Sequence, residues 1–496
     1  MNHFITTLTV TLALTLAATS HAAVALPSLI SDGAVLQQGL PVPIWGTAND
    51  GEKVTVKFQD QQVATVAKDG RWMVTLKPLK PGGPFPMTIA GTNTVEIHNL
   101  LVGEVWVCSG QSNMYFPLRQ ATGGPAAVAT CADPLLRLLS VPAQGLAEPP
   151  RDVAVSWKDC NPTNAAAFSA VAYFFGRDLR KARNVPVGLI HASFGGSGVQ
   201  FWMSWRAIQS DPNFKDWVEA RARAERTHAA ALAKYQQDET NLLAQWQAAA
   251  DQARQEGKPP PAKPAPPKKP TIVIGNIYNG MIAPLQPYPI RGVIWFQGES
   301  HSTTAAAYPK MFLGMIHGWR QDWGLGTFPF LFAQLGPFVT PEIREAQLVS
   351  WQQSTNTAMI VSADCNQGAK EVHFPNKEPV GARLALAARA VAYGEQIEFS
   401  GPIYDSVKFQ AGQAIISFTH TGGGLESRGG ELKGFTIAGA DKTFVPATAV
   451  IDGDQVVVTS AAVQNPRAVR YGWTNVPELN LFNKAGLPAS PFRTDR

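Results

Sequence analysis

Four nearly continuous apolar stretches constrain the fold of this chain more than any other feature. They lie at residues 185–192, 290–296, 328–333 and 357–361. A strand that is apolar on both sides must be covered on both sides, as in a parallel sheet with helices packed against each face. Helix-like sequences alternate with these strands, for example over 167–183 and 377–392. The pattern therefore predicts a doubly wound α/β domain.

A serine follows a further apolar run, in a position that suits a nucleophile. Val105–Val107 is apolar, and the chain then becomes small and polar up to Ser112. Ligands bind beyond the ends of strands in open α/β sheets, so we expect Ser112 to face a cleft. Gly110 permits a sharp turn, and Asn113 would open a helix whose N–H groups favour a negatively charged intermediate. On its own, the motif is equally typical of a capped strand-to-helix turn.

Ser112 can act as a nucleophile only with a base, a group that orients the base and donors for the oxyanion. Donors are available in two turns that follow apolar strands. The first, 192–198, contains Gly195 and Gly196, whose backbone N–H groups can point at the cleft. The second contains Gln297, whose side-chain amide can donate. Either turn alone would be an ordinary strand-to-helix connection, but two of them at strand ends in one domain favour a site.

His373 is the best candidate for the base. It lies in a loop just before a predicted helix, late in the chain as in other α/β hydrolases. His191 falls within a strand and His301 adjoins a turn, so both are weaker candidates. Glu371 or Asp364 could hold His373 in the tautomer that catalysis needs. No cluster of Cys and His has the spacing of metal ligands and no glycine-rich phosphate loop is present, so no metal or cofactor is expected.

Six motifs spread along the chain belong together. They are Gly103–Trp106, Gly110–Met114, Tyr278–Leu285, Trp295–Ser300, the loop around His373 and Ser490–Thr494. Taken together they resemble the sialate O-acetylesterases, a branch of the SGNH (GDSL-like) hydrolases, and the resemblance covers essentially the whole mature chain. It implies a flavodoxin-like, three-layer α/β/α core that removes acetyl groups from sugar hydroxyls.

The resemblance also assigns roles to the candidate residues. Ser112 would attack the acetyl carbonyl, and His373 would take its proton and later activate water. The oxyanion hole would consist of the Ser112 amide, a glycine of the pair Gly195 and Gly196, and the side chain of Gln297. An O-acetylated sugar, either a sialic acid or a polysaccharide, would be the substrate.

One position departs from the pattern of the family. The family commonly has aspartate two or three residues before the histidine and proline directly after it. Here these positions hold Glu371, Lys370 and Phe374. Glu371 is expected to be the acidic member of a Ser–His–acid triad, with Asp364 as the alternative. A Ser–His dyad without an acid is the third possibility.

The rest of the chain divides into further domains, because 496 residues are too many for one core. Short alternating strands separated by turn residues predict a β-sandwich-like domain over 23–102 and a second β domain over 401–496. Between them, 103–400 is expected to be the SGNH hydrolase domain. A helical insertion that ends in a proline-rich linker, at about 211–270, interrupts it. The insertion would either pack on the catalytic domain or serve as a spacer.

The N-terminus has the features of a secretory signal. An apolar run leads to small residues, which predicts a signal peptide over 1–22. No later segment has the length and apolarity of a membrane span. We therefore expect an exported, soluble protein, either periplasmic or extracellular. Of the four cysteines, Cys131 and Cys160 are the expected disulfide pair. The net charge of +5 is modest and partly confined to one linker, so no nucleic-acid partner is expected.

These observations predict an exported serine carboxylic-ester hydrolase, most simply a sialate O-acetylesterase. An acetylxylan esterase or another polysaccharide O-acetylesterase is an alternative of the same class, since the same site would serve. An alternative of a different class is a glycan-binding protein without activity on a hydrolase scaffold.

Overall fold

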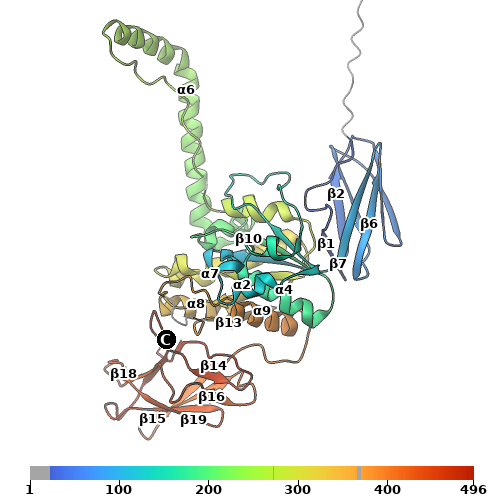
Figure 1. Cartoon of the computed structure of the whole chain (residues 1–496). Coiled ribbons are helices and arrows are strands. Elements are labelled where there is room, and N and C mark those ends of the chain that lie inside the picture. Colours follow the sequence, from blue (N-terminus) through green and yellow to red (C-terminus); the bar gives the residue numbers. More distant parts are fainter. Residues whose placement is uncertain (1–22, 272, 366–369, 496) are drawn as a thin grey trace, which may run out of the picture.

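The computed structural model describes residues 23–271, 273–365 and 370–495, so the expected signal peptide lies outside it. Figure 1 shows a central α/β body with a β domain on each side and a long helical arm that projects from the body. Within the described ranges, no helix combines the length and apolarity that a membrane span requires.

A seven-stranded path forms the sheet of the central body. In spatial order its strands are β13 (Thr357–Val361), β12 (Phe330–Gln334), β11 (Gly292–Phe296), β7 (Thr94–Gly110), β10 (Val187–Ser193), β8 (Asp133–Ser140) and β9 (Lys158–Cys160). All neighbours are parallel except β9, which runs antiparallel to β8. Every residue of β10, β11, β12 and β13 is buried, as their apolar sequences predict.

Helices cover both faces of this sheet. Four long ones pack there: α4 (Ala170–Arg183), α7 (Tyr308–Trp323), α8 (Pro341–Gln352) and α9 (Glu378–Val391). Trp106 of β7 packs on Phe175 of α4, with ring centroids 5.1 Å apart. Trp295 of β11 pairs with Ser109 of β7, a residue on the opposite face of that strand from Trp106. The Trp295 ring packs on Trp319 of α7, with ring centroids 5.9 Å apart. The two tryptophans therefore face opposite layers of helices, and the body is mixed α/β.

Strand β7 belongs to two parts of the molecule. The remaining strands of the N-terminal domain are β1 (Val35–Gln37), β2 (Val42–Thr47), β3 (Lys53–Phe58), β4 (Gln61–Val66), β5 (Arg71–Leu76) and β6 (Gly82–Ala90). The first half of β7 pairs with β1 and β6, and its second half pairs with β10 and β11. The boundary expected between residues 102 and 103 thus falls inside one strand. A single hydrophobic core also runs through both parts.

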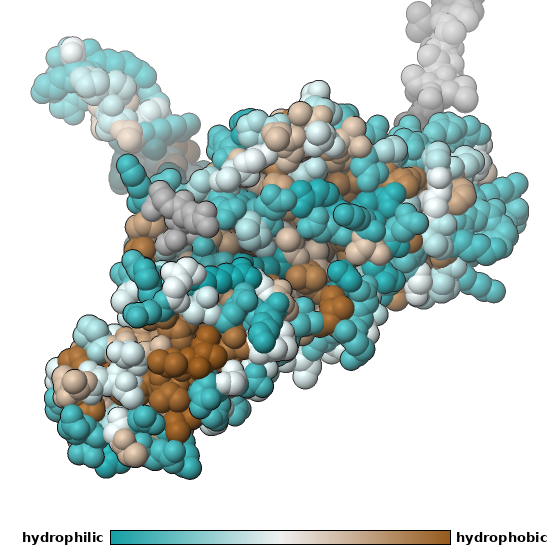
Figure 2. All heavy atoms as spheres, turned by 60° about the horizontal axis from the view of Figure 1, so that its bottom comes forward, coloured by the Kyte–Doolittle hydropathy of each residue, from teal (hydrophilic) through white to brown (hydrophobic). Residues whose placement is uncertain are grey.

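The C-terminal domain has a core of its own, built around Ile416, Val456 and Tyr471. Its strands are β14 (Ile403–Gln410), β15 (Gln413–Thr419), β16 (Leu425–Ser427), β17 (Phe435–Ala438), β18 (Val445–Pro446), β19 (Thr448–Asp452), β20 (Gln455–Thr459), β21 (Ala468–Tyr471), β22 (Leu481–Asn483) and β23 (Phe492–Arg493). They form two four-stranded sheets and one strand pair. Figure 2 shows apolar side chains gathered on this domain. On the outer face of the β14–β15–β20–β19 sheet, Val450 is 59% exposed.

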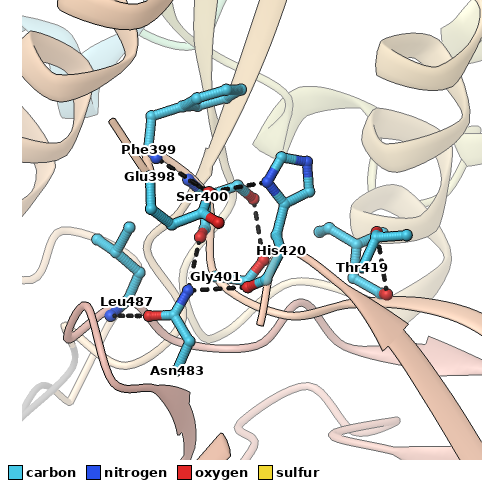
Figure 3. A network of polar contacts seen from close by, with 9 residues as sticks. Glu398, Phe399, Ser400, Gly401, Thr419, His420, Asn483 and Leu487 are labelled. Atoms are coloured by element: carbon cyan, nitrogen blue, oxygen red, sulfur yellow. Dashed lines mark hydrogen bonds and ion pairs between the residues drawn. The ribbon is translucent and has the colours of Figure 1, made fainter. Parts of the chain in front are cut away.

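Polar contacts join the C-terminal domain to the body (Figure 3). Glu398 accepts hydrogen bonds from the backbone of Ser400 at 3.2 Å and pairs with His420 Nδ1 at 2.8 Å. Asn483 Nδ2 donates to the carbonyls of Ser400 and His420, each at 2.9 Å. The His420 ring also packs near Trp351 of α8, with centroids 5.8 Å apart. The segment that connects the body to the C-terminal domain is therefore held by side chains rather than by a continuous strand.

A buried arginine makes a second connection. Arg344 of α8 is fully buried, and its guanidinium donates to the carbonyls of Thr474 and Asn475 in the C-terminal domain, both at 2.9 Å. It also donates to Gly336 and Val339 in the loop after β12. One side chain thus ties a loop of the body to a loop of the neighbouring domain.

The insertion forms the arm. Its helix, α6 (Lys215–Gln255), has 41 residues and is about 60 Å long. The proline-rich segment runs back along this helix, because Trp246 Nε1 donates to the Pro261 carbonyl at 2.9 Å and His228 Nε2 lies 3.1 Å from the Pro267 carbonyl. Only the base of the arm packs on the body. The expectation that the helix packs on the catalytic domain was therefore wrong for most of its length.

Shorter helices complete the fold. They are α1 (Ser112–Tyr115), α2 (Gly124–Ala129), α3 (Pro162–Ala165) and α5 (Trp205–Ser210). Cys131 and Cys160, near α2 and α3, lie side by side as predicted, and the Cys160 thiol donates to the Cys131 carbonyl at 3.2 Å. No disulfide joins them, and all four cysteines are buried free thiols. The expected disulfide is therefore not formed.

Candidate active site

The end of β7 places Ser112 beside the end of β11. Gly110 has a φ of +140°, and a Cβ atom there would lie 2.1 Å from the carbonyl oxygen of Phe296, so only glycine fits without a shift. The next backbone N–H, from Gln111, donates to the same carbonyl at 2.9 Å. Ser112 then opens the short helix α1 and is only half-buried. The serine is thus held at the carboxyl edge of the sheet, as its sequence position predicts.

His373 reaches Ser112 from the loop before α9. Its Nε2 atom lies 2.8 Å from Ser112 Oγ, within hydrogen-bond distance. The loop is fixed directly after the histidine, because Phe374 is buried and the Pro375 carbonyl accepts a hydrogen bond from Thr122 N at 2.9 Å. A hydroxyl and an imidazole in this contact are the arrangement that lets a base activate a serine.

The glycine turn after β10 borders the same serine. A Cβ atom on Gly195 would lie 3.8 Å from the Cβ of Ser112. Gly196 has a φ of +68°, and nothing lies within 4 Å of the place where its Cβ would be, so this backbone faces open space. The turn is joined to β7 by Phe194 N, which donates to the Gly110 carbonyl at 3.0 Å.

Gln297 lies behind this turn. It is fully buried, and the Tyr308 hydroxyl donates to its Oε1 at 3.3 Å, which fixes the orientation of the amide. Its Nε2 donates to the Ser197 carbonyl in the glycine turn at 3.0 Å. An amide nitrogen carries two hydrogens, so one N–H remains for another acceptor.

The two acids considered from the sequence lie differently. Glu371 is exposed, and no hydrogen bond or ion pair joins it to His373. Asp364 accepts two hydrogen bonds from Arg383, both at 2.7 Å, so its two oxygens already have a partner. Neither carboxylate contacts the imidazole in this structure.

The structure adds three side chains to which the sequence assigned no role in the site, those of Asn113, Glu299 and Lys377. The Asn113 side chain bonds Glu299 Oε1 at 2.5 Å and the carbonyl of Val372 at 3.1 Å, and it accepts a hydrogen bond from Lys377. Asn113 and Lys377 are buried directly behind the Ser112–His373 contact. A lysine at a helix start is usually solvated, so only the fold could reveal its place here.

The two other histidines considered have structural roles. Burial lowers the pKa of both His191 and His301 to about 4, so both are neutral at pH 7. His301 Nε2 accepts a hydrogen bond from Val199 N at 2.9 Å, and His191 Nε2 lies 2.6 Å from Ser193 Oγ. In the described part of the chain, no three His, Cys, Asp or Glu side chains gather in a way that could hold a metal ion.

Comparison with known proteins agrees with this geometry. Residues 271–390 match the family described as carbohydrate esterase, sialic acid-specific acetylesterase. The chain is 30% identical to the sialate O-acetylesterase of Rattus norvegicus, over 90% of each chain, and 28% identical to that of Homo sapiens, over 94% of this chain and 91% of the human one. The crystal structure of a carbohydrate acetylesterase from Xanthomonas citri is similar, with a TM-score of 0.79 and 36% identity over 95% of this chain and all of that one. The chain therefore belongs to the sialate O-acetylesterase family, and as a member of it is a carbohydrate O-acetylesterase.

Proposed function

We propose that this protein is an exported enzyme that hydrolyses O-acetyl esters of sialic acids through a serine acyl-enzyme. The 2.8 Å separation between His373 Nε2 and Ser112 Oγ carries the proposal. The names of the rat and human relatives support sialic acid as the sugar. The central parallel sheet covered by helices on both faces supports an SGNH-type, flavodoxin-like core, with 23–102 and 401–496 as flanking domains.

In the proposed reaction, Ser112 attacks the acetyl carbonyl while His373 accepts its proton. His373 then gives that proton to the sugar oxygen as its bond to the acetyl carbon breaks, so the sugar leaves with a free hydroxyl and the acetyl group stays on Ser112. Water, activated by His373, releases acetate and regenerates the serine. The negative charge on the carbonyl oxygen would be stabilised by the Ser112 N–H, by Gly195 or Gly196, and by the free N–H of Gln297.

The acid is the least supported member of the proposed triad. Glu371 is two residues before His373, but its exposed side chain would have to turn toward Nδ1 of the imidazole to act. Glu371→Gln should then lower kcat, though less than His373→Ala does. If Asp364→Asn lowers kcat and Glu371→Gln does not, Asp364 is the partner. If both variants keep wild-type kcat, the enzyme is a Ser–His dyad.

Ser112→Ala tests the mechanism most directly. The variant should fold normally and lose several orders of magnitude in kcat on 4-nitrophenyl acetate, since the nucleophile is gone. Gln297→Ala should lower kcat by roughly 10²-fold with little change in KM. Wild-type turnover by a folded Ser112→Ala protein would exclude the mechanism. The same result would be expected if the protein only bound glycans and the measured activity came from a contaminant.

The sugar is tested separately. Hydrolysis of acetylated sialosides and of acetylated xylo-oligosaccharides should be compared on the same enzyme preparation, by released acetate. A higher kcat/KM on sialosides is expected. A preference for the xylo-oligosaccharides would leave the mechanism in place and change the substrate to an acetylated polysaccharide.

A further inference from the structure

The side-chain amide of Asn113 connects the two segments that meet at the site. Asn113 directly follows Ser112 and is 1% exposed. Its Nδ2 donates at 3.1 Å to the carbonyl of Val372, the residue before His373, and at 2.5 Å to Glu299 Oε1. The amide therefore holds the loop of the candidate base against the helix of the candidate nucleophile.

Lys377 determines how this amide is oriented. Its Nζ donates to Asn113 Oδ1. An ammonium group can only donate, whereas the Val372 carbonyl and an ionised Glu299 carboxylate can only accept. Only one of the two orientations of the amide satisfies all three partners. Without the lysine, Oδ1 loses its donor, and the amide is held only at its nitrogen, by the Val372 carbonyl and Glu299.

The Lys377 ammonium also contacts three of the segments that form the candidate site. Nζ lies 3.7 Å from the ring centroid of Phe374, 5.1 Å from that of Phe116 and 5.5 Å from that of Phe296. These rings belong respectively to the His373 loop, to the end of α1 and to the end of β11. Contacts of a cation with aromatic faces are attractive, and more so when the cation is away from water.

The charge on Lys377 is balanced by Glu299. Glu299 Oε2 is buried and has no hydrogen-bond partner in the described part of the chain. Burial lowers the pKa of Lys377 to about 7, against the opposing effects of Glu299 and Cys365. Burial likewise raises the pKa of Glu299, against the effects of Asn113, Lys377 and His373. Removing either charge would leave the other buried without compensation.

We propose that Lys377 is a positioning residue of this esterase, whose ammonium orients the Asn113 amide and so holds His373 against Ser112. The inference rests on the proposed function, because it takes Ser112 and His373 as the reacting groups. Lys377 touches neither the substrate nor the reacting atoms. It acts through Asn113, and a shift of about 1 Å between nucleophile and base is enough to cost roughly 10²-fold in rate.

Lys377→Met is the direct test. It keeps most of the side-chain volume and removes the charge and the donor. Lys370→Met is the matched control, since it makes the same change at an exposed lysine in the same loop. On 4-nitrophenyl acetate, Lys377→Met should lower kcat by roughly 10²-fold with little change in KM, and Lys370→Met should leave both unchanged. Circular dichroism and the melting temperature report whether each variant is folded.

The pH profile distinguishes positioning from a purely structural role. Because burial lowers the pKa of Lys377 to about 7, the ammonium is present below that pH and is lost as the pH rises through it. The titratable groups whose charges act on it are Glu299 and Cys365, and burial raises the pKa of the Cys365 thiol to about 12, so this group stays neutral. Wild-type kcat should therefore fall on the alkaline side, and this fall should be absent in Lys377→Met. A structural lysine would instead leave the shape of the profile unchanged.

A second variant keeps the test decisive if Lys377→Met does not fold. Asn113→Asp preserves the size of the side chain and its bond to Lys377 but turns the donating nitrogen into an oxygen that faces Val372 and Glu299. It should also lower kcat at least roughly 10-fold with unchanged KM. Folded variants at both positions with kcat within about threefold of wild type would overturn the inference. Ser112→Ala, measured in parallel, tests the proposed function separately. If Ser112→Ala loses activity and the Lys377 and Asn113 variants do not, the proposed function stands and only the positioning role of Lys377 fails.

Discussion

The two β domains are attached to the catalytic body in different ways. The N-terminal domain shares strand β7 and one hydrophobic core with the body, and that strand ends two residues before Ser112. The C-terminal domain has a separate core and is joined through the polar contacts around Glu398 and His420 (Figure 3) and through Arg344. A shared strand cannot separate without breaking the sheet, whereas a polar junction can open while both cores stay intact.

This difference predicts how the molecule unfolds. The N-terminal domain and the body should unfold together in one transition, because removing one exposes apolar surface of the other. The C-terminal domain should unfold or undock in a transition of its own. Substitutions at the two junctions should therefore differ both in size and in the transition that they move.

The largest effect is expected for Arg291→Met at the N-terminal junction. Arg291 Nε pairs at 2.8 Å with Glu104 of β7, which is fully buried and also bonded by Gln37 of β1. Loss of the arginine leaves an uncompensated buried carboxylate and should lower the free energy of unfolding by about 3–5 kcal/mol. Urea denaturation followed by tryptophan fluorescence measures this. The double variant Arg291→Met with Glu104→Gln should recover part of the loss, and a split of the main transition in two would contradict a shared unit.

A smaller effect is expected for Arg344→Met at the C-terminal junction. The carbonyls of Thr474 and Asn475 would lose their donor, which costs about 1–3 kcal/mol. Part of this is offset, because burial already lowers the pKa of Arg344 to about 10 and its removal relieves that desolvation. The transition of the C-terminal domain should move to lower urea by more than that of the body, where the Gly336 and Val339 carbonyls also lose a donor. Equal shifts in both would show that the two domains are coupled, and the exposed Arg428→Met is the surface control.

The smallest effect is expected for Glu398→Gln in the linker. The amide oxygen can still accept from the Ser400 backbone, so the one interaction weakened is the contact with His420 Nδ1, which is an ion pair when the imidazole is protonated. Such partly exposed pairs contribute about 0.2–1 kcal/mol, and the difference from wild type should shrink in high salt. Thermal denaturation at low and high salt measures it. A loss above about 2 kcal/mol would mean that this pair, rather than Arg344, holds the domain.

The buried strands of the body could be predicted from the sequence, and the exposed strands only in part. The interval 357–361 was predicted as a strand and forms β13 with the same bounds, because a short apolar run between polar residues has few alternatives. The strands β4 and β6 are hard to recognise individually within 23–102, since most of their residues are exposed or only half-buried. The continuity of β7 across a predicted boundary was missed, because it depends on pairing between distant segments.

The candidate site shows the same limit. Ser112 and His373 could be selected because their residue types suit the chemistry and their positions follow strands, and they lie in contact. Lys377 could not, because its role depends on burial among three aromatic rings from separate segments. Residues that react are therefore easier to identify from a sequence than residues that hold them in position.

The arm described above limits how this protein can change in length. The helix α6 rises about 1.5 Å per residue, and an extended proline-rich chain rises about 3.1 Å. The helix leaves the body and the proline-rich segment runs back beside it. An insertion in one of these two segments alone would therefore leave the other too short to match it. Insertions and deletions are therefore expected in pairs, with about two to three helical residues for each residue of the proline-rich segment. The arm can lengthen or shorten by that rule while the sheet and the site keep their geometry.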